Sequence, residues 1–437
     1  GCRRADVLID GEKVEMLGHI PPELAAQSEV VDVTGCMLFP GFIDAHTHFD
    51  LDVCNTTTAD DFESGSKSAI RGGTTTVIDF ACPNKGESLA YGLDLWHKKA
   101  DGKCYCDYGF HMTIDDWNET IEREIDDMYA EGISSFKMYM TYPAMMIGDE
   151  AMYKALKKLK EKGGICGVHC ENAGVIDALI AEKKAAGENG VYCHPETRPD
   201  IMEAEAVGRL LRIAEQVDVP VVIVHTTNIE ALDEIANARW RGQKVFVETC
   251  PQYLVLDDSV YYNEDWLQAA KYVCSPPIRK PADREALWRA IRRGEVQTVS
   301  TDHCSFTTQQ KLAGRDDFTA IPGGIPGVPN LKADATVRKV CTEFAAAGKV
   351  VAAICAAPSV LAAFGILQGK KATVYPGMED KLTAAGAEYT GLPITLDGNI
   401  ITGEALGAAI PFALALASRL AGQQASNAVK QGIVYRY

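Results

Sequence analysis

The first three quarters of the chain alternate two patterns of apolar and polar positions. Short runs dense in β-branched residues, each of strand length, alternate with longer segments whose apolar residues recur at helical spacing. Eight strands are predicted, at residues 37–43, 74–80, 105–112, 135–142, 165–170, 219–225, 244–250 and 296–301. Helices are predicted at residues 66–71, 120–132, 152–162, 202–216, 229–241 and 282–294. The alternation predicts an α/β fold, a parallel eight-stranded β/α (TIM-like) barrel, and leaves a doubly wound open sheet as the alternative.

The segments on either side of this alternation have different patterns. Residues 6–36 predict short strands around turns, too few to complete a sheet by themselves. From residue 340 onward seven Lys and Arg face six Asp and Glu, whereas the whole chain has 43 against 60 and a net charge of −17. Because the excess of acidic over basic residues ends near residue 325, we predict that the chain has three parts. They are a partial β-sandwich segment at 1–38, the barrel at 39–328 and a C-terminal segment at 329–437.

Composition excludes several classes of partner. The net acidity argues against nucleic acid and against an anionic membrane surface, because both require a basic face. No run reaches the roughly 18 apolar residues of a membrane span, and the nearest candidate, residues 405–420, predicts a buried helix. The 14 cysteines lack the spacing of a disulfide framework, and no signal segment is recognised. We expect a cytoplasmic protein with mostly buried thiols.

Histidines and one carboxylate fall at the ends of predicted strands. His46 and His48 close the first strand, and alternate residues of a strand point to one face, so both imidazoles can reach one ion. His169, His225 and Asp302 end three further strands. Imidazole and carboxylate suit zinc and similar divalent ions, so this set predicts a metal site at the carboxyl ends of the strands. Three other histidines are expected to be ordinary core or surface residues: His19, His97 and His111.

Lys137 ends the fourth predicted strand, among these candidate ligands. A metal ion would repel an ammonium, so a lysine there could act only as the neutral amine or after adding carbon dioxide. The resulting carbamate has two anionic oxygens, which can bridge two metal ions. A surface or ion-pairing lysine is the alternative that composition leaves open.

Seven motifs, in this order along the chain, resemble the dihydropyrimidinase and D-hydantoinase family of the amidohydrolase superfamily. They are GFIDAHTH at 41–48, GGTTT at 72–76, SFKMYMTY at 135–142, VHCEN at 168–172, ETCPQY at 248–253, SPPIR at 275–279 and STDHC at 300–304. The resemblance covers about residues 6–328. The SFKMYMTY run favours the hydantoinase branch over the related dihydroorotases, which need an additional cation for a substrate carboxylate.

The resemblance implies an enzyme with two divalent metal ions, most often zinc. By matching motifs, the ligands would be His46, His48, Lys137, His169, His225 and Asp302. The first two and Asp302 would hold one ion, the other two histidines would hold the second, and Lys137, carboxylated by carbon dioxide, would bridge them. A hydroxide between the ions would open a dihydropyrimidine or hydantoin ring to an N-carbamoyl amino acid, as in pyrimidine catabolism. The family also implies a homo-oligomer, a tetramer or dimer.

Three further residues follow from the same resemblance. Asp302 would act first as the general base and then as the general acid. Tyr142 matches the hydrogen-bond donor to the developing oxyanion, and Ser275 matches a residue that contacts the cyclic amide through its backbone. The chain departs from the family at Gly323, where an asparagine is frequent, so only backbone groups are expected there.

From residue 329 onward the chain instead resembles the C-terminal half of the ThiJ/PfpI family, flavodoxin-like proteins centred on a cysteine. The matches are AGKVVAAICAAP at 347–358, KATVYP at 371–376, EDK at 379–381 and PFALAL at 411–416. Cys355 lies at a predicted strand-to-helix turn, where a thiol becomes more reactive, and is a candidate second site. The half of that family that supplies a glutamate to this thiol is not matched, and Tyr375 occupies the neighbourhood of its histidine.

Other functions stay open at this point. The tail could make the protein a ThiJ/PfpI-like thiol enzyme or redox sensor that uses Cys355. A non-catalytic dihydropyrimidinase-like assembly protein would be marked by lost metal ligands, but all of those predicted above are present. A fusion that does not fold stably is the remaining alternative.

Overall fold

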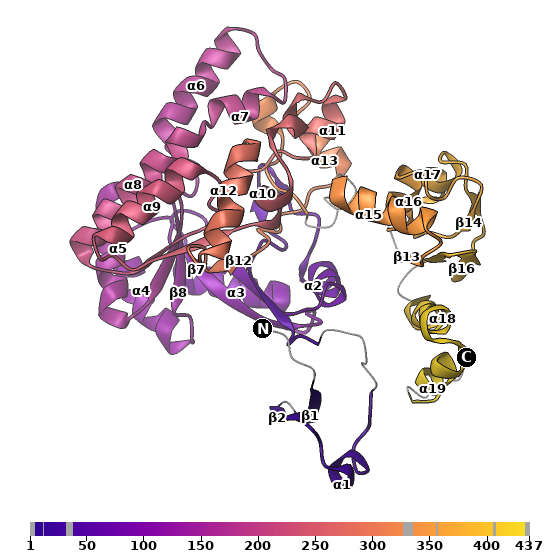
Figure 1. Ribbon diagram of the computed structural model, residues 1–437. Helices are drawn as coiled ribbons and strands as arrows, with labels where there is room; N and C mark the ends of the chain where they lie inside the picture. Colours follow the sequence, from indigo (N-terminus) through magenta and orange to yellow (C-terminus); the bar gives the residue numbers. More distant parts are fainter. Residues whose placement is uncertain are drawn as a thin grey trace. The chain divides into compact units, whose positions relative to one another are not determined.

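The computed structural model describes residues 5–11, 13–31, 38–326, 335–354, 357–404 and 408–432 (Figure 1). The chain divides into two compact units, Pro40–Asn330 and a second made of Gly1–Phe39 with Leu331–Tyr437. The boundaries predicted from the sequence, after residues 38 and 328, stay a prediction. None of the helices in the described ranges is long and apolar enough to cross a membrane.

The first unit is built on one eight-stranded sheet with the order β12-β11-β10-β9-β8-β7-β6-β3. Its strands are β3 (Phe42–Thr47), β6 (Thr74–Ala81), β7 (Asp107–Thr113), β8 (Ser135–Tyr139), β9 (Ile165–His169), β10 (Val221–Ile223), β11 (Val245–Thr249) and β12 (Thr298–Val299). All seven neighbouring pairs are parallel. The predicted parallel α/β fold with eight strands is therefore confirmed.

The two outer strands of this sheet meet at their carboxyl ends. A single parallel bridge pairs Thr47, the last residue of β3, with His303 beyond β12. The Asp44 carboxylate reinforces it by accepting hydrogen bonds from the Thr301 amide at 3.0 Å and hydroxyl at 2.6 Å. The sheet is thus curled and TIM-like, but one bridge and side chains, rather than a full ladder, join its outer strands.

The first predicted strand is wrong in its position. Residues 37–43 were expected to form it, whereas β3 spans Phe42–Thr47 and carries His46 within the strand. Pro40 has no amide hydrogen to donate to a ladder. Pairing with β6 accordingly begins at Phe42, opposite Thr74, and the apolar run before it stays exposed at Leu38 and Phe39.

Helices follow most of the strands and line the outside of the sheet. The longer ones are α2 (Phe62–Arg71), α3 (Leu89–Ala100), α4 (Glu119–Ala130), α5 (Asp149–Lys162), α6 (Ala173–Ala185), α8 (Asp200–Val217), α9 (Ile229–Trp240) and α12 (Pro281–Arg292). Shorter ones are α7 (Cys193–Thr197), α10 (Pro251–Val255), α11 (Trp266–Ala270), α13 (Thr308–Leu312), η1 (Asp258–Tyr262) and η2 (Phe318–Ala320). In Figure 1, α4 packs on α5, α5 on α8, and α8 on α9.

All six predicted helices are confirmed, and two long ones were missed. In α6 only Ile176 is buried, so its sequence has no apolar stripe to recognise. In α3 the side chain of Ser88 caps the first turn, and Trp96 is buried with its indole nitrogen 2.9 Å from the Asp79 carboxylate. That carboxylate also accepts the Thr47 hydroxyl at 2.8 Å, so the helix is tied to the end of β3.

The N-terminal segment forms one antiparallel hairpin, β1 (Asp6–Asp10) with β2 (Lys13–Gly18), followed by the short helix α1 (Pro22–Ala25). Within the described residues these two strands pair only with each other. Ile9, Val14 and Leu17 are more than half exposed. The described part of this segment is therefore a two-stranded sheet without a core of its own.

The C-terminal segment has a small core around a three-stranded sheet. In it β13 (Val351–Ile354) is parallel to β17 (Ile400–Gly403), which pairs antiparallel with β16 (Ile394–Asp397). Its other elements are α15 (Ala335–Ala346), α16 (Pro358–Ala363), β14 (Lys371–Ala372), α17 (Glu379–Thr383), β15 (Glu388–Tyr389), α18 (Ala409–Ala421) and α19 (Gln423–Gly432). Buried residues such as Leu367, Val374 and Leu382 form the core.

Gly348, at a φ of 68°, lies between the end of α15 and the start of β13. The buried helix predicted at residues 405–420 is α18, but of its described side chains only Leu414 is buried, so that prediction is wrong in its burial. Cys355 lies outside the described residues.

Candidate active site at the carboxyl ends of the strands

The structure brings the six predicted ligands to one edge of the sheet. His46 lies in β3, Lys137 in β8 and His169 at the end of β9. His48, His225 and Asp302 follow directly after β3, β10 and β12 or within a few residues of them. All but Asp302 are buried, and Asp302 is half-buried. In a parallel β/α sheet this edge is the place for a functional site.

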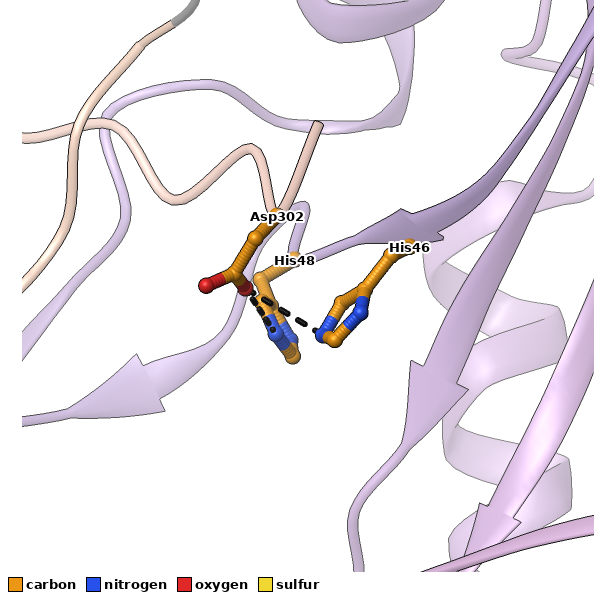
Figure 2. Close-up of side chains that lie close together, drawn as sticks. All are labelled: His46, His48 and Asp302. Carbon is orange, nitrogen blue, oxygen red and sulfur yellow. Dashed lines mark ion pairs between the residues drawn. The ribbon is translucent and has the colours of Figure 1, made fainter. Parts of the chain in front are cut away.

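His46, His48 and Asp302 form a compact cluster (Figure 2). The Oδ1 atom of Asp302 lies 3.2 Å from Nε2 of His46 and 3.2 Å from Nε2 of His48. The three ligand atoms lie within 4.8 Å of one another, as the ligands of one ion must. In Figure 2 the carboxylate points toward both imidazoles from the loop after β12.

His225 and His169 extend this cluster into a row of four imidazoles. Successive ring centroids are 5.2 Å apart from His48 to His46, 5.6 Å from His46 to His225 and 4.5 Å from His225 to His169. Burial lowers the pKa of His46 and His225 well below the usual histidine value, so both rings are neutral, the form that binds a metal. The row therefore offers ligands to more than one ion.

Several ring nitrogens in this row fit a bound cation. Within the described part of the chain, Nε2 of His46, Nδ1 of His48 and Nδ1 of His225 are buried without a hydrogen-bond partner. A buried polar atom left unpaired costs about 1–3 kcal/mol. Divalent ions coordinated by Nε2 of His46 and Nδ1 of His225 would remove that cost for these two atoms, so the donor set fits the family's metal ions.

Lys137 is fully buried among these groups. Its Nζ lies 5.0 Å from the ring centroids of both Phe80 and Tyr139, and no described residue forms an ion pair with it. Burial lowers the pKa of Lys137, although the charges of Asp302 and Glu248 act in the opposite direction. A lower pKa increases the fraction of neutral amine, which is the form that can add carbon dioxide.

Two carboxylates that sequence analysis did not identify lie within hydrogen-bond distance of ring nitrogens of His46 and His169. Glu248 lies 2.6 Å from Nδ1 of His46, and Glu171 lies 2.7 Å from Nε2 of His169. The Arg198 guanidinium donates to the same Glu171 oxygen at 2.7 Å. Burial would raise the pKa of Glu171, but Arg198 and His169 outweigh it and lower the pKa to about 2.

These carboxylates fix which nitrogen of each ring carries the proton. A ring that donates one N–H to a carboxylate presents the lone pair of its other nitrogen, which is the arrangement typical of metal-bound histidine. Glu171 stands two positions after His169, and Glu248 lies in the motif ETCPQY on β11, next to β10 and His225. The alternation of a strand was therefore the signal that could have found Glu171.

Tyr142, Ser275 and Gly323 lie beside this row. The Tyr142 ring is 5.1 Å from that of His169, and the Ser275 side chain lies near enough to act on the pKa of the Tyr142 phenol. Burial raises that pKa, so the phenol keeps its proton and remains a hydrogen-bond donor. A Cβ placed on Gly323 would lie 3.9 Å from the Ser275 hydroxyl.

Among the described residues, no hydrogen bond uses the Ser275 amide or carbonyl, whereas the carbonyls on either side are held. The Cys274 carbonyl lies 2.8 Å from Nε2 of His194, and the Pro276 carbonyl accepts the Tyr253 hydroxyl at 2.8 Å. A rigid loop with unpaired polar groups suits the recognition of a planar amide.

Backbone strain is also concentrated at this edge. Tyr142, His225 and Asp302 have φ angles of 68°, 37° and 51°, which non-glycine residues rarely adopt. Each such residue costs about 1–3 kcal/mol, and strain of this kind gathers where side chains must be held for function. All three belong to the predicted site.

Comparison with known sequences agrees with this geometry. A sequence model of the Amidohydrolase family matches residues 37–343, and one of the DJ-1/PfpI family matches residues 290–419. The D-hydantoinase of Streptomyces coelicolor is 40% identical over 380 residues, 86% of this chain and 80% of that protein. The D-hydantoinase of Geobacillus stearothermophilus is 44% identical over 74% of this chain and 68% of its own length.

Two further relatives are dihydropyrimidinases. A dihydropyrimidinase of Dictyostelium discoideum is 40% identical over 74% of this chain and 65% of its own length. The crystal structure of a dihydropyrimidinase from Brevibacillus agri superposes with a TM-score of 0.72 at 44% identity, covering 74% of this chain and 70% of that one. This chain thus spans about two thirds to four fifths of the length of these relatives. It belongs to the amidohydrolase family, and its C-terminal part matches the DJ-1/PfpI family.

Proposed function

We propose that the protein is a metal-dependent cyclic amidohydrolase, which opens a dihydropyrimidine or hydantoin ring to an N-carbamoyl amino acid. The row of four imidazoles with Asp302, around buried Lys137, carries this proposal. The names of the relatives, D-hydantoinase and dihydropyrimidinase, support the choice of substrate class.

The ligand set supports two divalent ions, with zinc as the proposed metal. His46, His48 and Asp302 would hold one ion, and His169 with His225 would hold the other. A carbamate on Lys137 would supply an oxygen to each. When bound, such ions lower the pKa of a coordinated water to near 7 and polarise a carbonyl group.

The protein's own groups would handle the proton and the substrate. The Asp302 carboxylate would take the proton of the attacking water and deliver it to the ring nitrogen that leaves. The Tyr142 hydroxyl would donate a hydrogen bond to the oxygen of the attacked carbonyl. The amide and carbonyl of Ser275, which no described residue binds, would pair with the complementary carbonyl and N–H of the cyclic amide.

Solution state and compartment are part of the same proposal. We propose a cytoplasmic homo-oligomer, a tetramer or dimer, as in the family. The 14 cysteines lack the spacing of a disulfide framework, which supports a reducing compartment. Native mass spectrometry of the full chain measures the assembly.

Glu248→Gln should weaken metal binding without unfolding the protein. The substitution replaces the charged partner of His46 Nδ1 by a neutral one, so the ring is oriented less firmly and is less basic. Loss of such a partner lowers metal affinity by about 10- to 100-fold. Competition against a chelating dye measures the affinity, and Glu150→Gln, at an exposed carboxylate of α5, is the matched control.

Ring opening of a small panel tests the proposed reaction. The full chain, supplied with zinc and bicarbonate, is assayed in the ultraviolet with dihydrouracil, hydantoin and dihydroorotate. Turnover of either of the first two with formation of the N-carbamoyl product is the expected result. Preference for dihydroorotate would reassign the chain to another branch of the superfamily, and no turnover of any compound would refute the proposal.

A further inference from the structure

Lys311, in α13, is a buried cation that the proposed chemistry does not use. Its side chain is 2% exposed, and its Nζ donates hydrogen bonds to the carbonyls of Val273 at 3.0 Å, Pro322 at 2.6 Å and Gly324 at 2.9 Å. These bonds use all three donors of an ammonium. No ion pair with a described carboxylate is seen, so the three backbone oxygens, with the Phe306 ring 5.6 Å from Nζ, offset the cost of its burial.

The three carbonyls belong to two segments that lie far apart in the sequence. Val273 stands two residues before Ser275, while Pro322 and Gly324 flank Gly323. One direct backbone bond, from the Gly324 amide to the Val273 carbonyl at 2.9 Å, also joins the two segments. Lys311 is therefore a clamp between the two loops that hold Ser275 and Gly323.

The close packing of these loops leaves them little freedom to compensate for a lost clamp. A Cβ on Gly324 would lie 2.3 Å from the Cys304 carbonyl oxygen, so the backbone there passes tightly against the loop after Asp302. The Cys304 thiol in turn lies 3.8 Å from the Gly323 carbonyl. A shift of either loop would change the distance between the Ser275 backbone and the facing Gly323 segment.

We propose that Lys311 is a positioning residue for substrate binding: its ammonium sets the separation of the Ser275 and Gly323 loops, between which the cyclic amide is held. The inference rests on the proposed function, because that function pairs the ring amide with the Ser275 backbone; the inference adds the facing Gly323 segment. Lys311 does not touch the reacting atoms, so its loss should weaken substrate binding more than it slows the bond-breaking step.

The protonation of Lys311 should make the effect of this clamp depend on pH. Burial lowers the pKa of Lys311 to about 8, although the Cys274, Cys304 and Cys54 thiols act in the opposite direction. The ring of His194, bound to the Cys274 carbonyl, is the other titratable group affected by this charge. Below pH 8 the ammonium makes three hydrogen bonds, and above it the neutral amine can donate only two.

The test compares Lys311→Met, which keeps the length of the side chain but removes its donors, with Lys311→Arg, which stays charged at every pH used. Lys154→Met, at an exposed lysine of α5, is the control. For dihydrouracil at pH 7 we expect Lys311→Met to raise KM about tenfold or more with kcat changed less than about threefold, the pattern of lost binding. Bound metal should equal that of the unsubstituted chain.

The pH profile separates positioning from a merely structural role. In the unsubstituted chain KM should rise as pH passes about 8, and in Lys311→Arg this rise should disappear. A KM that stays flat from pH 7 to pH 9.5 in the unsubstituted chain would overturn the inference, and this measurement needs no substituted protein. Equal loss of kcat and metal in Lys311→Met would also contradict it.

Hydrogen exchange provides a measurement that does not depend on turnover. Peptides covering residues 272–277 and 321–326 should exchange faster in Lys311→Met than in the unsubstituted chain, while the strands of the sheet keep their protection. Unchanged exchange in both loops would refute the clamp even if the chain opens no ring. If both loops exchange faster in Lys311→Met but the unsubstituted chain opens no ring, the clamp is supported and only the proposed reaction is refuted.

Discussion

Lys137→Ala is expected to abolish ring opening and to remove most of the bound metal. The substitution deletes the group that we propose to bridge both ions, at a position that is fully buried beside Phe80 and Tyr139. Without it, the four imidazoles and Asp302 would face two dications with a single negative charge among them. We expect kcat/KM for dihydrouracil to fall by about a thousandfold or more.

Two further variants and an NMR measurement test whether activity requires the carbamate on Lys137. Lys137→Arg keeps a long cationic side chain but its guanidinium cannot form the carbamate, so it should be as inactive as Lys137→Ala. Lys154→Ala, at an exposed lysine paired with Glu150, should behave as the unsubstituted chain. Carbon-13 NMR after incubation with labelled bicarbonate should show a carbamate carbon in the unsubstituted chain and in Lys154→Ala, but in neither Lys137 variant. Full metal content and turnover in Lys137→Ala would contradict the bridging role.

Asp302→Asn is expected to stop the reaction at the chemical step. The asparagine keeps the shape of the side chain near His46 and His48 but can neither accept nor return a proton at neutral pH. General acid–base groups contribute about 10²- to 10⁴-fold, so kcat should fall within that range. KM should change little, because Tyr142 and Ser275 are untouched.

The assay is run with metal in excess, because Asp302 is also a proposed ligand. Direct measurement of bound metal in the same samples separates a weaker site from lost proton transfer. Asp316→Asn, an exposed aspartate in the same region, is the control. If Asp302→Asn retains kcat within about threefold at full metal occupancy, another group must carry the proton.

Much of the site follows from where polar residues fall along the strands. His46 and the following His48 can point to one side because they stand two residues apart at the end of β3. His169 ends β9, and His225 and Asp302 follow within three residues of β10 and β12, at the same edge of the sheet. Periodicity alone therefore predicted that these groups converge. The position of Lys137 had left a bridging carbamate and an ordinary lysine open, and the family resemblance chose the first. It also added the roles of Tyr142 and Ser275, which spacing does not provide.

The partners that orient the ligands could not be read from the pattern. Arg198 follows the short helix α7, far from His169 in the sequence, and reaches it only through Glu171. Lys311 contacts three carbonyls that no side-chain pattern marks. Such contacts depend on how loops fold back over the sheet, and loops lack the periodicity that strands and helices have.

The limits of the pattern also explain the misplaced strand. The apolar run at residues 37–43 predicts a strand but not its first residue. The first residue of the strand depends on where pairing with β6 begins. Phe42 and Ile43 belong to β3 and remain more than half exposed, which is unusual for a barrel strand. Apolar content therefore identified the strand without locating its ends.

Titration of the metal-depleted full chain with zinc tests the central claim most directly. Bicarbonate is supplied throughout, and ring opening of dihydrouracil is measured at each ratio of bound zinc to protein. We expect no turnover without metal, and a rise in turnover that stops at two ions per chain. Turnover that survives metal removal, or that reaches its plateau without a second ion, would contradict a site in which Lys137 joins the two groups of histidines.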